Sequence, residues 1–441
     1  MPNEVRISSG PGLQWYLVTI FLFVFFGIYA SIIWIVVTLM LALITFLYLR
    51  YRHIPIITSL LDTDWYKLTM GQVVFHRFPA ANAVYRFYNR GKTEFPVGFA
   101  EALHTELEHL SKVSLSHEEI MWLDHQDVLC DDYILFLKDY RFNPDQVKIE
   151  QKDGQLEIMV EGSWAQTILW EVPLMAIISE LYFRMTGKTY YETPFYMVTD
   201  VKATKMSQAG VKWSDFGTRR RFSKATQDIV NEVMSRYTNN GFIGTSNPYF
   251  AMKYGLQQIG TYAHEAVMAM QALHGAADSN AKWMEYWWME YGLYPHLLTA
   301  LPDTLTSDVF LRTFKGDLLN KYMAVRQDSG DPSEFADKFI QHYKNHGINP
   351  KEKKIVFSDS LDADKAVALQ AKYGDSVQCV MGIGTNLTND CGHKPLNMVI
   401  KLVAIDFGSG LKPVVKLSDD KGKHTGDCEK IEEIKKELGL S

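Results

Sequence analysis

The sequence predicts an α/β protein whose larger part is a parallel sheet with helices, joined to a smaller part that mixes helices with antiparallel strands. Three observations support this prediction. Residues 54–195 combine helical periodicity with a hairpin pattern, residues beyond 196 alternate short apolar strands with amphipathic helices, and polar clusters follow several of those strands. Such alternation is typical of parallel sheets, whose functional groups gather at the carboxyl ends of the strands.

The N-terminal segment is unusually apolar, because residues 13–49 contain no charged side chain. A helix of about 20 apolar residues is long enough to cross a bilayer. Arg50 and Arg52 follow the run, and basic flanks face the cytoplasm. We therefore expect residues 1–53 to form a membrane anchor, as one long span or two short ones, with the catalytic part in the cytoplasm. A buried helical hairpin is the alternative.

The next stretch, residues 54–195, contains both helix and hairpin signals. Apolar residues at helical spacing predict a helix near residues 99–110. Ser116 and Glu119 form a capping-box pattern that opens a short helix around residues 120–123. Alternating apolar residues on both sides of Asp153-Gly154 predict a β-hairpin over residues 147–160. This stretch is therefore expected to be α+β.

Beyond residue 196 the pattern changes to strands and helices in alternation. Amphipathic periodicity predicts helices over residues 223–237, 263–273, 333–346 and 362–373. Short apolar runs predict strands over residues 354–357, 377–381 and 398–405.

Two polar clusters next to these strands suit a phosphorylated ligand. In the segment MGIGTN, residues 381–386, glycines let backbone N–H groups approach an anion closely. The segment RQDSGD, residues 326–331, combines a permanent cation with two carboxylates, which suits a ligand that carries both phosphates and hydroxyls. A simple strand-to-loop turn and an Asx turn are the respective structural alternatives.

Three further clusters have equally simple alternatives. The segment DFGTRRR, residues 215–221, places an aromatic ring beside three cations and could otherwise be a solvated basic turn. His264 opens a predicted helix, where a lone histidine is more often structural. Asp359 and Asp362 follow another strand and could serve only as helix caps.

Composition excludes some classes of protein. The 45 Lys and Arg residues and 51 Asp and Glu residues give a net charge of −6. Nucleic acid is therefore not expected as a partner, because phosphate backbones are bound by basic surfaces. The 4 cysteines include no CxxC pair, which is typical of a reducing compartment without a disulfide framework.

Taken together, the clusters resemble those of the nicotinate phosphoribosyltransferase family. The matching segments, in chain order, are LLDTDWYKLTM, RFNPDQV, LWEVPLMAIISE, DFGTRRRFS, GTSN, GTYAHE, RQDSGD, VFSDSLD, MGIGT, KPLNMVIKL and KLSD. They extend over nearly the whole chain after the apolar segment, which itself has no counterpart in the family. A single segment of this kind arises by chance, whereas so many in the same order do not.

The resemblance implies the fold of the type II phosphoribosyltransferases, an irregular α/β barrel joined to a smaller α+β domain. Residues 196–394 would form the catalytic barrel. Residues 54–195, completed by residues 395–441, would form the smaller domain, and residues 1–53 would be the added transmembrane segment. The resemblance also implies a homodimer with shared active sites.

The family reaction joins nicotinate to 5-phosphoribosyl 1-pyrophosphate and gives nicotinate mononucleotide and diphosphate. By resemblance it is the entry step of NAD synthesis from the free acid, it needs Mg²⁺, and it is driven by ATP through a phosphohistidine. Which residues bind the metal stays open.

Site residues carry over by position. His264 matches the phosphorylated histidine, with Asp303 near it. Phe216 and Tyr66 match the aromatic residues on the two faces of the pyridine ring, and Tyr66 is expected from the second subunit. The remaining matches are cations for carboxylate and phosphates, acidic positions around ribose and metal, the 5-phosphate loop and a further substrate position: Arg219, Arg326, Asp328, Asp359, Gly384, Thr385 and Asp64.

Ser246 bears on substrate choice. Related nicotinamide enzymes carry an acidic residue at this place, which accepts a hydrogen bond from an amide but repels a carboxylate. Serine there predicts a preference for nicotinate over nicotinamide. The alternative function is a catalytically inactive, membrane-tethered barrel that acts as a ligand sensor or an uptake accessory.

Overall fold

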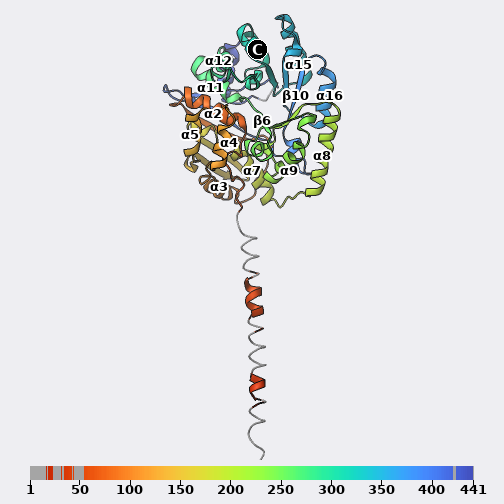
Figure 1. Ribbon diagram of the computed structural model, residues 1–441. Helices are drawn as coiled ribbons and strands as arrows, with labels where there is room; N and C mark the ends of the chain where they lie inside the picture. Colours follow the sequence, from red (N-terminus) through yellow and green to blue (C-terminus); the bar gives the residue numbers. More distant parts are fainter. Residues whose placement is uncertain are drawn as a thin grey trace, which may run out of the picture. The chain divides into compact units, whose positions relative to one another are not determined.

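The computed structural model describes residues 54–420 and 424–440, and within the N-terminal segment Tyr16, residues 18–22, Ser31, residues 34–41 and Leu43. The chain divides into two units, Met1–Ile54 and Pro55–Ser441 (Figure 1). Everything below concerns the second unit unless stated.

The predicted membrane anchor is not supported. Apart from Ile54, the described residues of the first unit are helical, but no helix in the described part of the chain combines the length and apolar character that a bilayer span requires. The prediction of a membrane-anchored protein is therefore wrong. Hydropathy measures the apolar character of a segment and does not by itself establish the length of a helix. The remaining residues of the predicted span or spans lie outside the described part.

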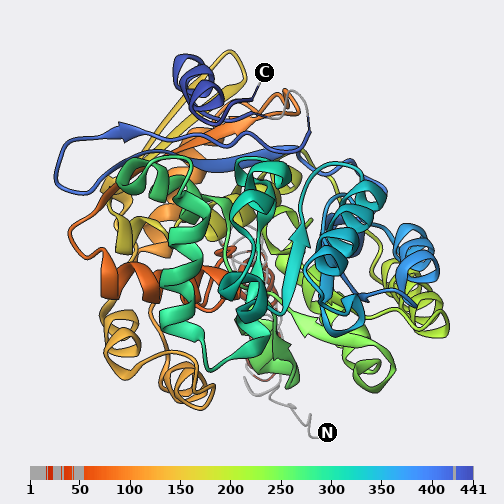
Figure 2. The same ribbon diagram turned by 90° about the horizontal axis from the view of Figure 1, so that it is seen from above.

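The smaller sheet is antiparallel and has the strand order β12-β11-β1-β3-β2. The predicted hairpin is confirmed by β2 and β3, which pair around Asp153-Gly154. Figure 2 shows the late strand β11 (blue) beside β1 (orange), and residues Met398 and Asn89 are paired in register. The strand bounds are β1 (Asn82–Asn89), β2 (Val147–Lys152), β3 (Gln155–Ser163), β11 (Met398–Asp406) and β12 (Lys412–Pro413).

Most helices that precede the larger sheet in the chain surround the smaller sheet, whereas α8 packs against α9 and α16. The predicted helix over residues 99–110 is confirmed, and Ser116 and Glu119 form both hydrogen bonds of the capping box. The bounds are α2 (Trp65–Arg77), α3 (Phe99–Leu110), α4 (His117–Asp124), α5 (Asp131–Asp139), η1 (Pro144–Gln146), α6 (Trp164–Thr167), α7 (Glu171–Met185) and α8 (Glu192–Gln208).

The larger sheet has seven strands in the order β6-β5-β4-β10-β9-β8-β7, and all neighbours are parallel. Strands β6 and β7 lie at its two edges, so the described residues form an open, curled sheet and not a closed barrel. The bounds are β4 (Trp213–Asp215), β5 (Phe242–Thr245), β6 (Gln257–Gln258), β7 (Thr299–Ala300), β8 (Ala324–Gln327), β9 (Lys354–Phe357) and β10 (Gln378–Ile383).

The helices predicted for this part are present within a residue or two of their expected ends. In Figure 1, α8 and α16 lie together on one side of the sheet. The helix bounds are η2 (Thr218–Arg220), α9 (Lys224–Ser235), η3 (Thr238–Asn240), α10 (Pro248–Tyr254), α11 (His264–His274), α12 (Ser279–Tyr291), η4 (Pro295–Leu297), η5 (Pro302–Thr304), α13 (Ser307–Thr313), α14 (Asp317–Lys321), α15 (Pro332–Asn345), η6 (Pro350–Glu352), α16 (Ala363–Tyr373), α17 (Thr385–Thr388) and α18 (Cys428–Glu437).

The carboxyl ends of the parallel strands define one edge of the sheet. Strands β4, β5, β8, β9 and β10 each end at the residue or two before a predicted site position. Those positions are Phe216, Ser246, Asp328, Asp359 and Gly384. Because the strands are parallel, these residues are brought to a common edge although they are far apart in the sequence.

Candidate active site

The first compartment of the site is a cavity of about 200 Å³ with aromatic and polar walls. Tyr66, Phe216 and Arg219 line it together with Asp64 and Ser246. A cavity of this kind, mostly apolar with a few placed polar groups, is typical of a site for a small ring compound.

Phe216 is held in this cavity by the strand next to it. Its backbone N–H donates to the carbonyl of Ile383 at 2.8 Å. A Cβ atom at Gly382 would lie 2.4 Å from Cε2 of the Phe216 ring. The glycine at 382 therefore makes room for the aromatic ring, while Gly384 and Thr385 line the neighbouring cleft.

Tyr66 reaches the same cavity from the first turn of α2. The N–H of Trp65 donates to the Ser246 carbonyl at 2.6 Å, which fixes the start of α2 against the end of β5. The guanidinium carbon of Arg219 lies 5.9 Å from the centre of the Tyr66 ring. Tyr66 and Phe216 thus come from one chain. The expectation that a second subunit supplies Tyr66 is corrected, because Tyr66 lines the cavity of its own chain together with Phe216.

The polar groups of this cavity already bind one another. Ser246 Oγ donates to Asp64 Oδ1 at 2.6 Å, so its hydroxyl is engaged. Arg219 lies 3.6 Å from Asp64 Oδ2 and 3.4 Å from Glu171 Oε1. Burial raises the pKa of Asp64, because a charged carboxylate is poorly solvated there. Arg219 and Arg326 are thus cations at this cavity that could contact an anionic ring substituent.

A larger polar cleft of about 780 Å³ adjoins this cavity. Phe216, Arg219 and Arg326 line both, so the two compartments are contiguous. The cleft is lined by further cations, by carboxylates and by the glycine-threonine turn: Arg90, Arg220, Lys401, Lys416, Asp328, Asp359, Gly384 and Thr385. Such a mixture suits a ligand with several phosphate charges and sugar hydroxyls.

Arg326 and Asp328 connect the two strands β8 and β9 at this cleft. Arg326 donates from Nε to Ser358 Oγ at 2.9 Å and from Nη2 to Asp328 Oδ1 at 2.5 Å. Burial alone would raise the pKa of Asp328, but Arg326 and His264 outweigh it and hold that pKa well below its usual value. Asp328 is therefore ionised at neutral pH.

Two other acidic residues of the same segments cap helices. Asp331 Oδ1 accepts from the N–H groups of Ser333 and Glu334, and Asp362 Oδ1 accepts from the N–H of Lys365. The structural alternative was thus correct for Asp331 and Asp362. Asp359 lines the cleft instead.

His264 is buried at the first position of α11, beside both compartments. Its Nε2 lies 2.9 Å from Asp328 Oδ2 and 2.9 Å from Lys416 Nζ, and its Nδ1 lies 3.0 Å from Thr304 Oγ1. Burial and then the charge of Lys416 lower its pKa to about 4, although Asp303 and Asp328 oppose this. The imidazole is therefore neutral at pH 7. The directions of these bonds depend on the tautomer: a proton on Nε2 is donated to Asp328, whereas a proton on Nδ1 is donated to Thr304 and leaves the Nε2 lone pair to accept from Lys416.

Asp303 completes this group. Its Oδ2 accepts from Ser329 Oγ at 2.6 Å and lies 3.1 Å from Lys416 Nζ. Its buried Oδ1 has no hydrogen-bond partner among the described residues and lies 3.8 Å from His264 Nε2. Ligand atoms of His264, Asp303 and Asp328 all lie within 4.8 Å of one another. An unsatisfied carboxylate oxygen here fits a cation.

The sequence reasoning gave no role to Lys416, Lys401, Glu171 or Thr304, all of which lie at the site. Lys401 could have been identified from the sequence as a site residue, because it is a charged residue inside the apolar strand β11. Burial lowers its pKa to about 8. The positions of the others depend on tertiary packing.

Some residues of the recognised segments hold the scaffold. Asp62 and Arg221 form a buried bidentate ion pair, with distances of 2.7 and 2.9 Å. Asp215 is buried and accepts hydrogen bonds from Gly217 N, Gln227 and Asn231. These contacts join the segment before α2 to the ends of β4 and β5, and so position Asp64, Phe216 and Ser246.

Two family models match the chain. The N-terminal domain of the nicotinate phosphoribosyltransferase family matches residues 61–179, and the nicotinate phosphoribosyltransferase family matches residues 211–441. A nicotinate phosphoribosyltransferase of Desulforapulum autotrophicum is 42% identical over 379 residues, which are 85% of this chain and 97% of the relative. One of Chromohalobacter salexigens is 42% identical over 386 residues, 87% of this chain and 98% of the relative.

Solved structures agree with these sequence matches. The crystal structure of the nicotinate phosphoribosyltransferase from Porphyromonas gingivalis superposes with a TM-score of 0.85 at 37% identity, and covers 87% of this chain and 100% of its own. That of the Vibrio cholerae enzyme has a TM-score of 0.81 at 34% identity, with 88% and 94% covered. The chain belongs to the nicotinate phosphoribosyltransferase family.

Proposed function

We propose that this chain joins nicotinate to 5-phosphoribosyl 1-pyrophosphate. In the transfer, the pyridine nitrogen forms a bond to ribose C1 while the bond from C1 to the pyrophosphate oxygen breaks, and the electron pair leaves with pyrophosphate. The products are nicotinate mononucleotide and diphosphate. Asp328, ionised in the polar cleft next to Arg326, is placed to stabilise the positive charge that develops at C1.

The observation that supports this proposal is the contiguity of the two compartments. Tyr66 and Phe216 both line the ring cavity, and Arg219 and Arg326 line both this cavity and the charged cleft. A ring nitrogen and an activated sugar would therefore meet at a common boundary. Bringing the two reactants together in this way removes much of the entropic barrier of a bimolecular transfer.

His264 is proposed to accept the γ-phosphoryl group of ATP. Its imidazole is neutral, and the lone pair on Nε2 is the nucleophile. The new bond is Nε2–P, the bond from phosphorus to the ADP oxygen breaks, and ADP leaves. Lys416 and Asp303 surround Nε2 on the protein side. The phosphohistidine is then hydrolysed to phosphate, which couples ATP consumption to the transfer.

The carboxylates of this cleft fit Mg²⁺, which prefers oxygen ligands. Asp303 Oδ1 lacks a hydrogen-bond partner within the described residues, and Asp328 and Asp359 line the same region. These residues would hold the ion. When bound, Mg²⁺ neutralises pyrophosphate charge and so improves the leaving group.

Nicotinate is the proposed substrate in preference to nicotinamide. The substituent of the ring meets Arg219, while Ser246 carries no charge and is hydrogen-bonded to Asp64. We expect kcat/KM for nicotinate to exceed that for nicotinamide at least tenfold, about 1.4 kcal/mol.

A homodimer remains a prediction of the family resemblance. Because Tyr66 lines the cavity of its own chain, the site as described does not depend on a second subunit. Light scattering of the purified protein would measure the mass in solution.

The alternative of an inactive, membrane-tethered barrel is not favoured. An inactive barrel would not need a buried histidine with three polar neighbours. A membrane tether is not supported, because no helix among the described residues could span a bilayer.

The test is a steady-state assay with nicotinate, phosphoribosyl pyrophosphate and Mg²⁺, with and without ATP. Formation of nicotinate mononucleotide, faster with ATP, is expected. Labelled ATP should phosphorylate the protein, and His264→Ala should abolish the label while His274→Ala, at the other end of α11, keeps it. Absence of the mononucleotide under all conditions would refute the transferase, and a label that survives in His264→Ala would refute the phosphohistidine.

A further inference from the structure

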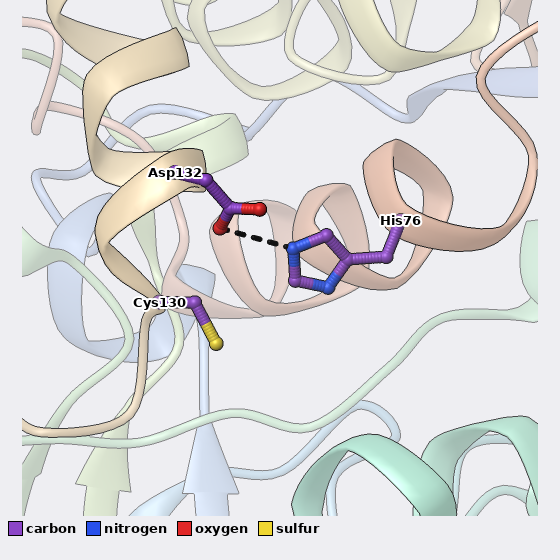
Figure 3. Close-up of side chains that lie close together, drawn as sticks. All are labelled: His76, Cys130 and Asp132. Carbon is purple, nitrogen blue, oxygen red and sulfur yellow. Dashed lines mark hydrogen bonds and ion pairs between the residues drawn. The ribbon is translucent and has the colours of Figure 1, made fainter.

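A second group of metal-type ligands lies away from the active site. His76 is in the last turn of α2, while Cys130 and Asp132 are at the start of α5 (Figure 3). Ligand atoms of the three residues all lie within 4.8 Å of one another. His76 Nε2 faces Asp132 Oδ1 at 3.2 Å, and Cys130 is exposed. None of these residues lines the two compartments of the active site.

The histidine of this group is oriented from behind. Its Nδ1 lies 2.6 Å from Oε1 of Glu290 on α12. Only 8% of the Glu290 side chain is exposed, and this carboxylate also accepts from Arg77. A carboxylate that holds one ring nitrogen and so presents the other is the arrangement that surrounds metal-ligating histidines. The contact of Glu290 with His76 is an observation separate from the closeness of the three ligand atoms.

The loop that carries the cysteine is fixed as well. The N–H of Cys130 donates to Gln72 Oε1 at 2.6 Å, and Gln72 Nε2 donates to the Val128 carbonyl at 3.4 Å. Gln72 is one turn before His76 on α2. The two elements that supply the ligands are thus held together next to the group itself, which reduces the ordering needed when an ion binds.

A nucleophilic role for the thiol is less consistent with its surroundings. The Cys130 thiol lies beside the Asp132 carboxylate, whose negative charge disfavours a thiolate. Reactive cysteines need neighbours that favour the thiolate. A divalent cation among these groups is one such neighbour.

We propose that His76, Cys130 and Asp132 bind a Zn²⁺ ion, with water in the fourth position. The bonds formed are Zn–Nε2, Zn–Sγ and Zn–Oδ, the thiol proton goes to solvent, and Nδ1–H stays donated to Glu290. No oxidation or reduction occurs. A thiolate, an imidazole and a carboxylate form a donor set that suits Zn²⁺, while Mg²⁺ and Ca²⁺ require oxygen ligands.

The consequence is a link between this site and the ring cavity through one helix. Zinc would tie the last turn of α2 to α5, and the first turn of α2 carries Tyr66. Residues ten positions apart on a helix are separated by about 15 Å. The ion would thus stabilise the helix on which the pyridine wall is built, without contact to substrate.

The experiment uses the reduced full chain, freed of metal, and titrates it with Co²⁺ and Zn²⁺ alone. We expect one equivalent of Co²⁺ to give a thiolate-to-metal charge-transfer band that Zn²⁺ bleaches. The group of His264, Asp303 and Asp328 contains no sulfur, so it cannot give this band. The charge-transfer band reports metal binding at His76, Cys130 and Asp132, whereas formation of nicotinate mononucleotide reports the proposed transferase. A negative result in one measurement therefore does not refute the other proposal.

Variants separate this site from other cysteines. Cys130→Ser and His76→Gln should abolish the band, and Glu290→Gln should weaken Zn²⁺ binding about tenfold or more. Cys428→Ser is the matched control, because Cys428 is also an exposed free cysteine at the start of a helix, and it should keep the band. Zn²⁺ should raise the Tm of the parent protein and of Cys428→Ser but not of Cys130→Ser. Absence of the band in the parent, or an unchanged band in Cys130→Ser, would overturn the proposal.

Discussion

Lys416 Nζ lies 2.9 Å from His264 Nε2, so a buried ammonium group faces the nitrogen that is proposed to accept phosphate. The two residues come from parts of the chain far apart in sequence, α11 and the segment after β12. Burial first, and then this proximity, keep the histidine neutral, because a buried charge is poorly solvated and two positive charges at this distance repel.

Replacement of Lys416 by methionine should raise the pKa of His264. The charge of Lys416 lowers that pKa, so without it the imidazole is protonated at higher pH. We expect the pH below which the rate of phosphohistidine formation falls to rise by about one unit. Labelling with ATP across a pH series measures it. Lys412→Met, in the exposed strand β12, is the control, and an unchanged value of this pH in Lys416→Met would contradict the assignment.

The buried histidine should also make folding stability pH-dependent. Its pKa is lowered from 6.5 to about 4, so its contribution is complete above pH 6.5 and is lost as the pH falls toward 4. The loss is up to about 3 kcal/mol of unfolding free energy. Urea unfolding of the parent and of His264→Gln at several pH values tests this. The difference between the two proteins should change over this window; a constant difference would show that His264 does not titrate as described.

Alanine at position 382 should disturb nicotinate binding through the Phe216 ring. The added Cβ would be 2.4 Å from Cε2 of Phe216 and would displace the ring into the cavity. Overpacking of this kind costs about 1–3 kcal/mol, roughly 5- to 100-fold in the KM for nicotinate. Steady-state kinetics should show a smaller change in the KM for phosphoribosyl pyrophosphate. The double variant Gly382→Ala/Phe216→Leu should be folded as well as Phe216→Leu alone; if Gly382→Ala leaves the KM unchanged, the contact is unimportant.

Aspartate at position 246 should reduce the preference for the acid. It would place a second carboxylate beside Asp64, whose Oδ1 is now 2.6 Å from Ser246 Oγ. Repulsion of the nicotinate carboxylate should lower its kcat/KM at least tenfold, about 1.4 kcal/mol, relative to that for nicotinamide. Ser246→Asn has similar size without charge and should change the ratio less. Equal effects of the two substitutions would show that size, and not charge, controls the choice.

Removal of Asp62 should destabilise the fold strongly. Burial opposes ionisation of Asp62, but Arg221 and Lys224 lower its pKa to about 2, so the pair is charged. Asp62→Ala leaves Arg221 buried without its carboxylate, at a cost of about 3–5 kcal/mol of unfolding free energy. Denaturant unfolding measures it. The exposed pair Lys205–Asp364 is the control, because Asp364→Ala should cost less than about 1 kcal/mol. Similar losses in both variants would contradict a special role for the buried pair.

Much of the secondary structure was predictable from local pattern. The strand over residues 354–357 matches β9 at both ends, and the capping box at Ser116 and the hairpin at Asp153-Gly154 are present. These features depend on contacts within a few residues. The N-terminal anchor was not predictable in the same way, since an uncharged run does not by itself establish a spanning helix.

The candidate site was predictable as a set of segments but not as an arrangement. Asp331 and Asp359 have the same chemistry and both follow a strand, yet one caps α15 and the other lines the cleft. The subunit that supplies Tyr66 was likewise not predictable from the sequence, because it depends on where α2 packs.

The sequence by itself determined the family, the order of the strands and helices, and the residues available for chemistry, because each of these follows from residue types at short spacing. Only the tertiary structure decided that Lys416 faces His264, that Ser246 is hydrogen-bonded to Asp64, and that His76, Cys130 and Asp132 converge. These pairs join distant parts of the chain, and their distances depend on how whole elements pack.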